Sequence, residues 1–113
     1  MNIQIFGTKK CNDTKKAQRY FKERGIPFQF INMSEKQMSK GEFRSVCQAV
    51  GGMNVIINEA CKDKNIVALL KYIVEEEKEQ KILENQQVIK TPIVRNGNLA
   101  TVGYSPEIWK SWS

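Results

Sequence analysis

One cysteine, between a predicted strand and a predicted helix, is the residue of this sequence best placed for chemistry. Cys11 follows the run Phe6-Gly7-Thr8-Lys9-Lys10 and precedes the run Asn12-Asp13-Thr14-Lys15-Lys16. The order of strand, glycine-containing turn and helix start places the sulfur at a helix N-terminus, where unpaired N–H groups and the helix dipole favour negative charge. The lysines on both sides add positive charge, so the pattern predicts a thiol of lowered pKa and a reactive thiolate. The alternative is a small buried apolar residue, which is how most single cysteines behave.

The composition limits what could activate this thiol. The chain has no histidine, and its three cysteines lack metal-type spacing. A Ser-His or Cys-His nucleophile pair within the chain, a histidine-ligated zinc and a disulfide framework are therefore excluded. We expect no metal and no bound cofactor, and an activation of the thiol by backbone groups and cations alone.

The bulk properties predict one soluble cytoplasmic domain. The chain has 113 residues, of which 41% are hydrophobic and 27% charged, as in an ordinary globular domain. The longest apolar run, Ile66–Leu70, is too short to cross a membrane, and the first residues predict a strand rather than a signal peptide. The net charge of +6 comes from lysines interleaved with glutamates, which predicts a mixed solvated surface and no direct nucleic-acid binding. The charge also fits an anionic small thiol or an acidic partner protein.

The elements that must position Cys11 form a predicted βαβ unit. Residues 2–6 alternate apolar and polar and predict a strand, after which Gly7 begins a turn. A helix is predicted over about 14–24, capped by one residue of 12–14 and burying Ala17, Tyr20 and Phe21. A second strand is predicted over 28–32, parallel to the first.

Two helical regions are predicted in the middle of the chain. Ser39 and Glu42 form a capping-box pattern that begins a helix ending at Gly51-Gly52, with Cys47 on its apolar stripe and therefore in the core. The stretch 53–85 is less regular. A helix over 66–74, with its apolar face formed by Ile66, Leu69, Leu70 and Ile73, precedes a charged helical run over 75–83. These two runs form either one long helix or two helices with a break near residue 75.

A hairpin and a short helix are predicted for the last part of the chain. Asn96-Gly97 is a strong hairpin signal between strands at 93–95 and 99–102. Ser105-Pro106-Glu107 predicts a helix start, and Ile108, Trp109 and Trp112 are expected to pack that helix. One mixed sheet flanked by helices satisfies this order of elements.

With these elements in place, the sequence resembles the ArsC/Spx family of arsenate reductase-like proteins, which have the thioredoxin fold. The motifs that carry the resemblance are the stretch 6–17 around Cys11, Gly25-Ile26-Pro27-Phe28, Lys90-Thr91-Pro92-Ile93-Val94-Arg95-Asn96-Gly97 and Val102-Gly103-Tyr104-Ser105-Pro106-Glu107. It covers almost the whole chain. It implies one α/β domain over 1–113, with a parallel βαβ half, an antiparallel hairpin half and a helical insertion over about 36–85.

The resemblance also implies that Pro92 is the cis proline of the thioredoxin fold. Thr91 would then set its backbone against the Cys11 sulfur, where a peptide or glutathione backbone could pair with it. The alternative is a trans proline that opens an edge strand.

The chain departs from the dithiol pattern of the family. Thioredoxins carry Cys-x-x-Cys, whereas this chain has Cys11-Asn12-Asp13-Thr14. Thr14 cannot act as a resolving thiol, but its hydroxyl and N–H can donate hydrogen bonds to a Cys11 thiolate and lower its pKa. Oxidised Cys11 is then expected to end as a mixed disulfide with glutathione or another small thiol. Cys61, in a polar stretch, is the one distal candidate for a resolving thiol.

A second departure concerns arsenate. The arsenate reductases of the family hold the oxyanion with arginines around the cysteine, one of them directly before the cis proline. Here that position is Thr91, preceded by Lys90. A lysine does not replace the bidentate fork of an arginine, so the pattern argues against arsenate as the substrate. None of the arginines of the chain falls on a position that matches an oxyanion-holding arginine of the family; they are Arg19, Arg24, Arg44 and Arg95.

The function expected from residues and resemblance together is a thiol oxidoreductase of the arsenate reductase or glutaredoxin type. Glutathione, glutaredoxin or thioredoxin would reduce the mixed disulfide. The expected catalytic residues are Cys11, Thr14 and Lys10, and the expected substrate- or thiol-binding residues are Thr91, Pro92, Lys9, Asn12 and Asp13. The alternative is an Spx-like regulator that binds the RNA polymerase α subunit without turnover.

Overall fold

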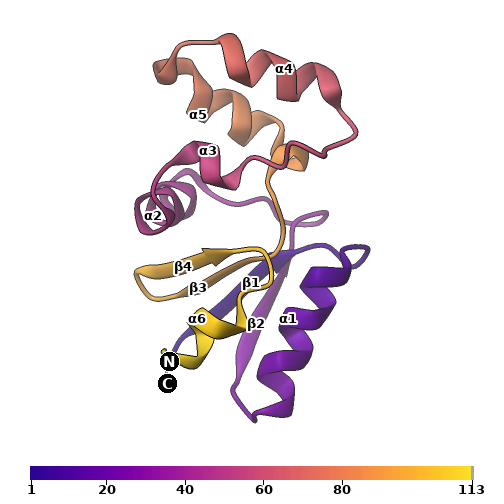
Figure 1. Cartoon of the computed structure of the whole chain (residues 1–113), viewed down its shortest axis with the longest axis vertical. Coiled ribbons are helices and arrows are strands. Elements are labelled where there is room, and N and C mark those ends of the chain that lie inside the picture. Colours follow the sequence, from indigo (N-terminus) through magenta and orange to yellow (C-terminus); the bar gives the residue numbers. More distant parts are fainter. Residues whose placement is uncertain (113) are drawn as a thin grey trace.

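The computed structural model describes residues 1–112, which build a four-stranded mixed sheet and several helices (Figure 1). The strands are β1 (Ile3–Gly7), β2 (Phe28–Asn32), β3 (Ile93–Asn96) and β4 (Leu99–Val102), in the spatial order β2-β1-β3-β4. β1 pairs with β2 in parallel, and β1 with β3 and β3 with β4 pair antiparallel. The predicted combination of a parallel βαβ half and an antiparallel hairpin half is therefore confirmed.

The alternating side chains of β1 point to the two faces of the sheet, and each face packs in its own hydrophobic core. Ile3 and Ile5 face α1 (Asn12–Glu23) and α6 (Pro106–Lys110), and Trp109 of α6 lies in the same cluster. Phe6 points to the other face of the sheet, where the helices that follow β2 supply the second core. Apolar side chains with a period of two thus anchor the central strand from both sides, which fixes its register.

Helices fill the chain between β2 and β3, as the resemblance implies. They are α2 (Lys40–Val50), α3 (Met53–Ile56), α4 (Lys64–Tyr72), α5 (Glu75–Glu84) and the 3₁₀ turn η1 (Gln86–Val88). α2 contacts β4, whereas α3, α4 and α5 lie beyond α2, at the end of the molecule opposite α1 and α6 (Figure 1). We refer to residues 53–88 as the helical lobe.

The local signals around the first two helices are confirmed in part. The capping box of Ser39 and Glu42 is formed, and Gly51 ends α2 in the left-handed region at φ 97°. The first helix, however, begins at Asn12 rather than Thr14, and Cys11 itself occupies the N-cap position without a side-chain cap. Gly7 is the last residue of β1 and not part of the turn, because its backbone still pairs with β2.

Within the helical lobe, the structure decides between the two alternatives left open for the helical runs and corrects one residue of the predicted buried face. α4 and α5 are two helices separated at residues 73–74. Leu70 is buried and Ile66 and Ile73 pack against the core as predicted, but Val67 is buried in place of Leu69, which is 38% exposed, so the buried face of α4 is rotated relative to the predicted one. Cys61 is buried, contrary to its polar sequence context, and Cys47 is only half-buried at the edge of the core.

The C-terminal elements follow the predicted order with small shifts. Asn96 pairs with Leu99, so the two loop residues are Gly97 and Asn98, and Gly97 has a φ of 60°. Glycine with positive φ at the first loop position is typical of type II′ hairpins. Ile108 is 50% exposed and does not pack the last helix, because five residues turn only one face, that of Trp109, towards the core. None of the helices within residues 1–112 combines the length and the apolar character needed to cross a membrane.

Candidate active site at Cys11

The sheet brings Cys11 and Thr91 together from positions 80 residues apart. β1 and β3 are antiparallel neighbours in which Phe6 pairs with Ile93, so the end of β1 and the start of β3 lie at the same edge. The segment that follows β1 carries Cys11, and the segment that precedes β3 carries Thr91. The Cys11 Sγ donates a hydrogen bond to the Thr91 carbonyl oxygen at 3.6 Å, and the peptide bond between Thr91 and Pro92 is cis.

The N-terminus of α1 surrounds the sulfur with donors. Cys11 is the N-cap residue, with extended backbone at φ −82° and ψ 118°, and the helix then runs for 12 residues. The first N–H groups of a helix have no partner within the helix, and the helix dipole adds partial positive charge there. The backbone N–H groups of Asp13 and Thr14 are the ones that act on the Cys11 sulfur.

The surroundings of Cys11 favour its thiolate. Burial raises the pKa of the Cys11 thiol, but the hydroxyls of Thr14 and Thr91 and the N–H groups of Thr14 and Asp13 together outweigh it, so the pKa lies below its ordinary value. Hydrogen bonds to the charged form lower a pKa in this way. Thr91 thus offers its carbonyl oxygen to the thiol and its hydroxyl to the thiolate.

Thr14 is held against the sulfur by its burial. Its side chain is 0% exposed, and its Oγ1 has no hydrogen-bond partner among residues 1–112. A buried hydroxyl without a partner is costly. Ionisation of Cys11 supplies the acceptor that the Thr14 hydroxyl lacks. The position of this hydroxyl beside the sulfur therefore explains both its missing partner and the lowered pKa of Cys11.

Replacing Thr14 by Val is expected to slow the alkylation of Cys11 at neutral pH about tenfold, because a hydrogen bond to a charged group contributes about 1.5–3 kcal/mol. The midpoint of the rate–pH profile should move to higher pH, since the thiolate loses stabilisation and the pKa of Cys11 rises. Thr14→Ser is the matched control, because it keeps the hydroxyl. A Thr14→Val profile that overlays the wild type would remove Thr14 from the activation of the thiol.

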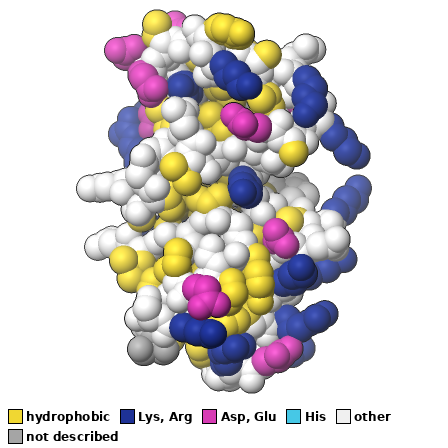
Figure 2. All heavy atoms as spheres, in the orientation of Figure 1, with side chains coloured by type: hydrophobic (Ala, Val, Ile, Leu, Met, Phe, Trp, Pro, Cys, Tyr) yellow, Lys and Arg dark blue, Asp and Glu magenta, His cyan; other side chains and the backbone are white. Residues whose placement is uncertain are grey.

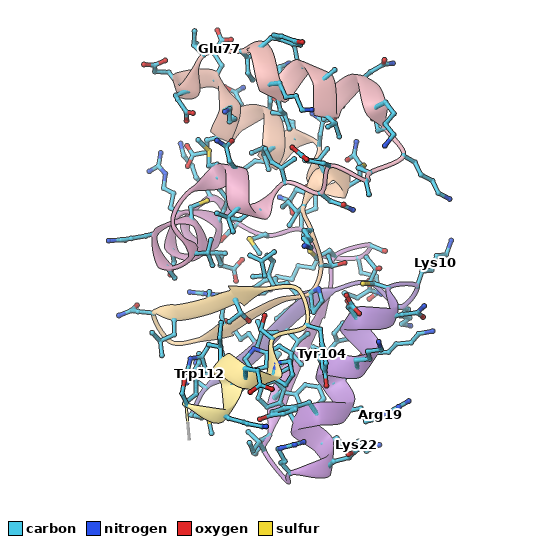
Figure 3. All side chains as sticks on the ribbon, viewed as in Figure 1. Lys10, Arg19, Lys22, Glu77, Tyr104 and Trp112 are labelled. Carbon is cyan, nitrogen blue, oxygen red and sulfur yellow. The ribbon has the colours of Figure 1, made fainter. Side chains whose placement is uncertain are left out.

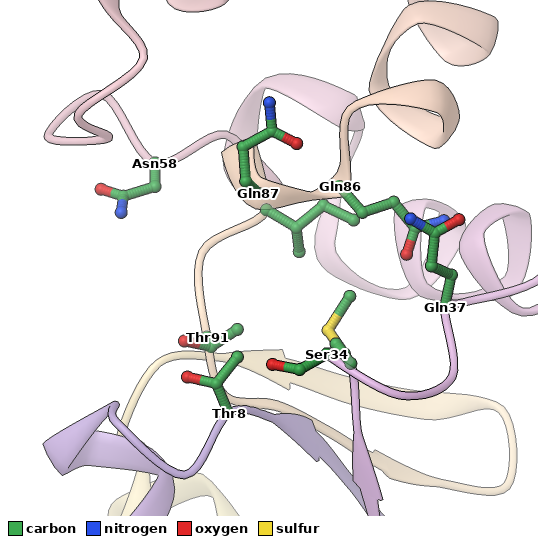
Figure 4. A pocket seen from close by; sticks show the side chains of 9 residues that line it. Thr8, Ser34, Gln37, Asn58, Gln86, Gln87 and Thr91 are labelled. Atoms are coloured by element: carbon green, nitrogen blue, oxygen red, sulfur yellow. The ribbon is translucent and has the colours of Figure 1, made fainter.

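Cys11 opens into a cleft of about 690 Å³ whose walls come from two parts of the chain. The sheet side supplies Thr8, Lys10, Cys11 and Thr91, and the helical lobe supplies Asn58, Ala60, Cys61, Lys62, Asp63 and Gln87. Among residues 1–112, only uncharged side chains line an adjoining cleft of about 400 Å³ (Figure 4). The two clefts share Thr8, Asn58, Gln87 and Thr91. Hydroxyl and amide groups of this kind suit a peptide-like ligand better than a compact anion.

The other predicted site residues take different positions. Pro92 is buried beside Thr91, and Asp13 pairs with Lys16 at 4.0 Å on the surface. Asn12 and Lys9 are exposed. Lys10 lines the cleft but extends into solvent (Figure 3). No lysine is among the groups that lower the pKa of Cys11, so hydroxyls and backbone N–H groups account for the activation.

The arginines lie away from the cleft. Arg44 forms an ion pair with Glu79 at 2.7 Å on the helical insertion. Arg95 donates to Gln4 at 3.0 Å across the sheet, and Arg24 lies over the ring of Tyr20. Among residues 1–112, no arginine lines either cleft beside Cys11, and no group of three potential metal ligands is found.

Two residues of the site, Asn58 and Gln87, were not predicted from the sequence, because their amides reach the cleft through tertiary packing and no local pattern marks them. Thr91 was predicted for its backbone, but the contribution of its hydroxyl was not. Cys61 lines the same cleft as Cys11, but its Sγ donates to the Gln87 carbonyl at 3.4 Å. Cys47 lies elsewhere, and burial raises the pKa of its thiol to about 11.

A mixed β2-β1-β3-β4 sheet, a cysteine at the first helix N-terminus and a cis proline beside it define a thioredoxin-like protein. Known structures agree with this class. NrdH-redoxin from Escherichia coli, described as glutaredoxin-like, matches with a TM-score of 0.51 and 17% identity, over 100% of this chain and 96% of the other.

Within that class, the family model of the ArsC family matches residues 6–112, and the chain belongs to this family. An arsenate reductase structure from Vibrio cholerae has a TM-score of 0.84 and 20% identity, over 98% of this chain and 97% of the other. The global transcriptional regulator Spx 2 of Oceanobacillus iheyensis is 28% identical over 109 residues, which is 92% of this chain and 78% of that protein. The predicted resemblance to the ArsC/Spx family is thus confirmed by matches to an arsenate reductase and to an Spx regulator.

Proposed function

We propose that this protein is a single-cysteine thiol–disulfide oxidoreductase with Cys11 as its nucleophile. The observation that carries the proposal is the surroundings of the sulfur, which lies at a helix N-terminus, against Thr91, with its pKa lowered by hydrogen bonds. A thiolate is the attacking form in disulfide exchange, and a lowered pKa increases its share at neutral pH.

The proposed reaction has two exchange steps. The Cys11 thiolate attacks one sulfur of a substrate disulfide, whose S–S bond breaks, and the second sulfur leaves as a thiolate that takes a proton from water. The resulting mixed disulfide on Cys11 is attacked by a thiolate of glutathione, glutaredoxin or thioredoxin, which releases Cys11 as a thiolate again. Thr14 and Thr91 stabilise the charge on Cys11 at the start and at the end of this cycle.

The remaining predicted residues are assigned supporting roles. Pro92 holds the Thr91 backbone beside the sulfur, and the N–H groups at Asn12 and Asp13 belong to the helix start that faces it. Lys10, at the rim of the cleft, and Lys9 next to it would attract the carboxylates of an anionic thiol such as glutathione. Such a protein needs no bound cofactor, and the glutathione pool that it would use is cytoplasmic.

Disulfides suit this site better than arsenate. No arginine lines the clefts described for residues 1–112, and the position before the cis proline is a threonine. Threonine hydroxyls and glutamine amides hydrogen-bond a peptide backbone, and Lys10 and Lys62, the cations of the Cys11 cleft, are point charges that do not give a tetrahedral dianion the bidentate contact of an arginine.

The test of this proposal is the rate of Cys11 alkylation by iodoacetamide against pH, followed by intact-mass measurement after addition of oxidised glutathione. The lowered pKa predicts a midpoint below the ~8.5 of a free thiol and a single glutathione adduct on Cys11. The rate should rise with pH through that midpoint and then level off. A midpoint of an ordinary thiol, with no adduct, would contradict the proposal.

A second candidate function is that of an Spx-like partner of RNA polymerase without turnover, and the match to Spx 2 favours it. If this function applies, the protein should capture the C-terminal domain of the polymerase α subunit in a pull-down, and Cys11→Ser should capture it equally well. Binding without any thiol exchange would favour this candidate over the oxidoreductase.

A further inference from the structure

The positive charge of the protein is concentrated around α1 rather than spread along the chain. Seven basic and two acidic residues lie between Lys9 and Arg24, whereas the rest of the chain has eleven basic and ten acidic residues. This segment therefore carries +5 of the net charge of +6. Lysines interleaved with glutamates describe the rest of the chain, but the excess positive charge lies almost wholly on this one segment.

The charges share one exposed face of α1. Burial of Thr14, Ala17, Tyr20 and Phe21 on the inner side leaves Lys15, Lys16, Arg19 and Lys22 in solvent. We call these four residues the α1 stripe. Arg19 and Lys22 point away from the sheet on the same side as Lys10 (Figure 3). Dark blue side chains also gather along this edge of the molecule in Figure 2.

Little within the described chain neutralises the α1 stripe. Lys16 approaches Asp13 to 4.0 Å, but both side chains are about half exposed, at 59% and 48%, and such pairs contribute little. No carboxylate of residues 1–112 lies within 4.0 Å of the charged groups of Lys15, Arg19 or Lys22.

The α1 stripe runs directly away from the reactive sulfur. Cys11 caps the helix, and a rise of 1.5 Å per residue puts Lys22 about 16 Å further along the axis. A small anion can contact only one or two of these charges at once. A surface that meets all of them must be large, and its near end would lie at the Cys11 cleft.

We infer that the α1 stripe is the docking surface for an acidic protein that exchanges a disulfide with Cys11. The inference rests on the proposed function and names its partner class. The Cys11 thiolate attacks one sulfur of the partner's disulfide, that S–S bond breaks, a disulfide forms between the two proteins, and the second partner sulfur leaves as a thiolate. A protein fits better than a nucleic acid, because the stripe leads to a thiol, for which a nucleic acid offers no reaction. Charge complementarity of this kind raises association rates by about 10- to 10³-fold.

The test uses three peptides that differ only in the residues around one cysteine, which are glutamates, glutamines or lysines. Each cysteine is linked as a disulfide to 2-thiopyridine, whose release gives the second-order rate constant by absorbance. Each constant is divided by the constant of the same peptide with 2-mercaptoethanol, a neutral thiol. The wild type should react at least about tenfold faster with the acidic peptide than with the neutral one at low ionic strength. The preference should vanish near 1 M salt, where the Debye length is about 3 Å.

Two variants with the same change in net charge locate the effect. Lys15→Gln/Arg19→Gln/Lys22→Gln should lose the acidic preference while its rate with the neutral peptide stays unchanged. Lys64→Gln/Lys71→Gln/Lys81→Gln, which changes exposed residues of the helical lobe, should keep the preference. Equal loss in both variants, or no preference in the wild type, would overturn the inference.

Two further outcomes separate this inference from its alternatives. If all three peptides react no faster than an ordinary thiol predicts, the proposed function fails and the inference fails with it. If the neutral peptide reacts fast without any acidic preference, only the inference fails. Binding of duplex DNA that is lost in the α1 variant but kept in the lobe variant, without a peptide preference, would assign the stripe to nucleic acid instead.

Discussion

Cys11→Ser is expected to lower the rate of disulfide exchange by at least about 10³-fold and to leave the fold intact. Serine at neutral pH is not ionised and cannot form the mixed disulfide, and loss of a nucleophile has effects of this size or larger. The free energy of unfolding should change by less than about 1 kcal/mol, because Cys11 is half-buried at an N-cap, a position that serine favours. Exchange with a neutral peptide disulfide and chemical denaturation measure the two effects.

The other two cysteines provide the controls. Cys47→Ala should retain exchange, because burial holds the pKa of that thiol at about 11 and leaves it protonated at neutral pH. Cys61→Ala should retain the first exchange step as well. If it keeps that step but loses repeated turnover, Cys61 is the resolving thiol of the Cys11 cleft. Exchange at the wild-type rate in Cys11→Ser would remove Cys11 from the mechanism altogether.

Gly7→Ala is expected to damage both the stability and the reactivity of the site. A Cβ added at Gly7 would lie 2.5 Å from the Cγ2 and 3.0 Å from the Cβ of Thr14, which is closer than real contacts allow. Thr14 is fully buried, so relief requires a shift of α1 or of β1. Overpacking of this kind costs about 1–3 kcal/mol. The displaced hydroxyl would no longer reach the Cys11 thiolate, so the pKa of Cys11 should rise and alkylation at neutral pH should slow about tenfold.

Gly41→Ala is the matched control for this prediction. Gly41 lies in α2, and a Cβ there meets no atom within 4 Å. Alanine in an exposed helix position stabilises by about 0.5–1 kcal/mol relative to glycine. The two substitutions should therefore shift the urea midpoint in opposite directions, and only Gly7→Ala should change the alkylation profile. An unchanged profile in Gly7→Ala would mean that the position of Thr14 does not control the thiol.

Local signals were sufficient for the strands of the sheet and for the start of α2. The alternation over 2–6, the capping box at Ser39 and the hairpin glycine at 97 can each be recognised within a few residues of sequence, and the structure bears them out. The helical lobe was harder because its short helices pack on one another, so burial there depends on neighbours far along the chain. Cys61 shows the difficulty, since its polar neighbours predict exposure, whereas the Gln87 carbonyl covers its sulfur.

The candidate site likewise has features that the local sequence predicts and features that depend on tertiary packing. The place of Cys11 at a helix N-terminus follows from the local order of elements, and the sequence predicted it. The orphaned hydroxyl of Thr14 and the fit of Gly7 against it were not predictable, because both depend on how closely α1 approaches β1. The lysines were expected to activate the thiol, but local charge in the sequence says nothing about which side chains turn towards solvent.

The two walls of the Cys11 cleft suggest how such a protein could diverge. Residues that act on the sulfur belong to β1, α1 and the segment before β3, whereas the opposite wall belongs largely to the loop 58–63 of the helical lobe. Substitutions at Ala60 and Lys62, the exposed residues of that loop that line the cleft, would alter which molecules fit without disturbing the groups that hold the thiolate. Specificity and reactivity would then depend on separate stretches of the chain, and a library confined to these two positions would test new substrates on an unchanged nucleophile.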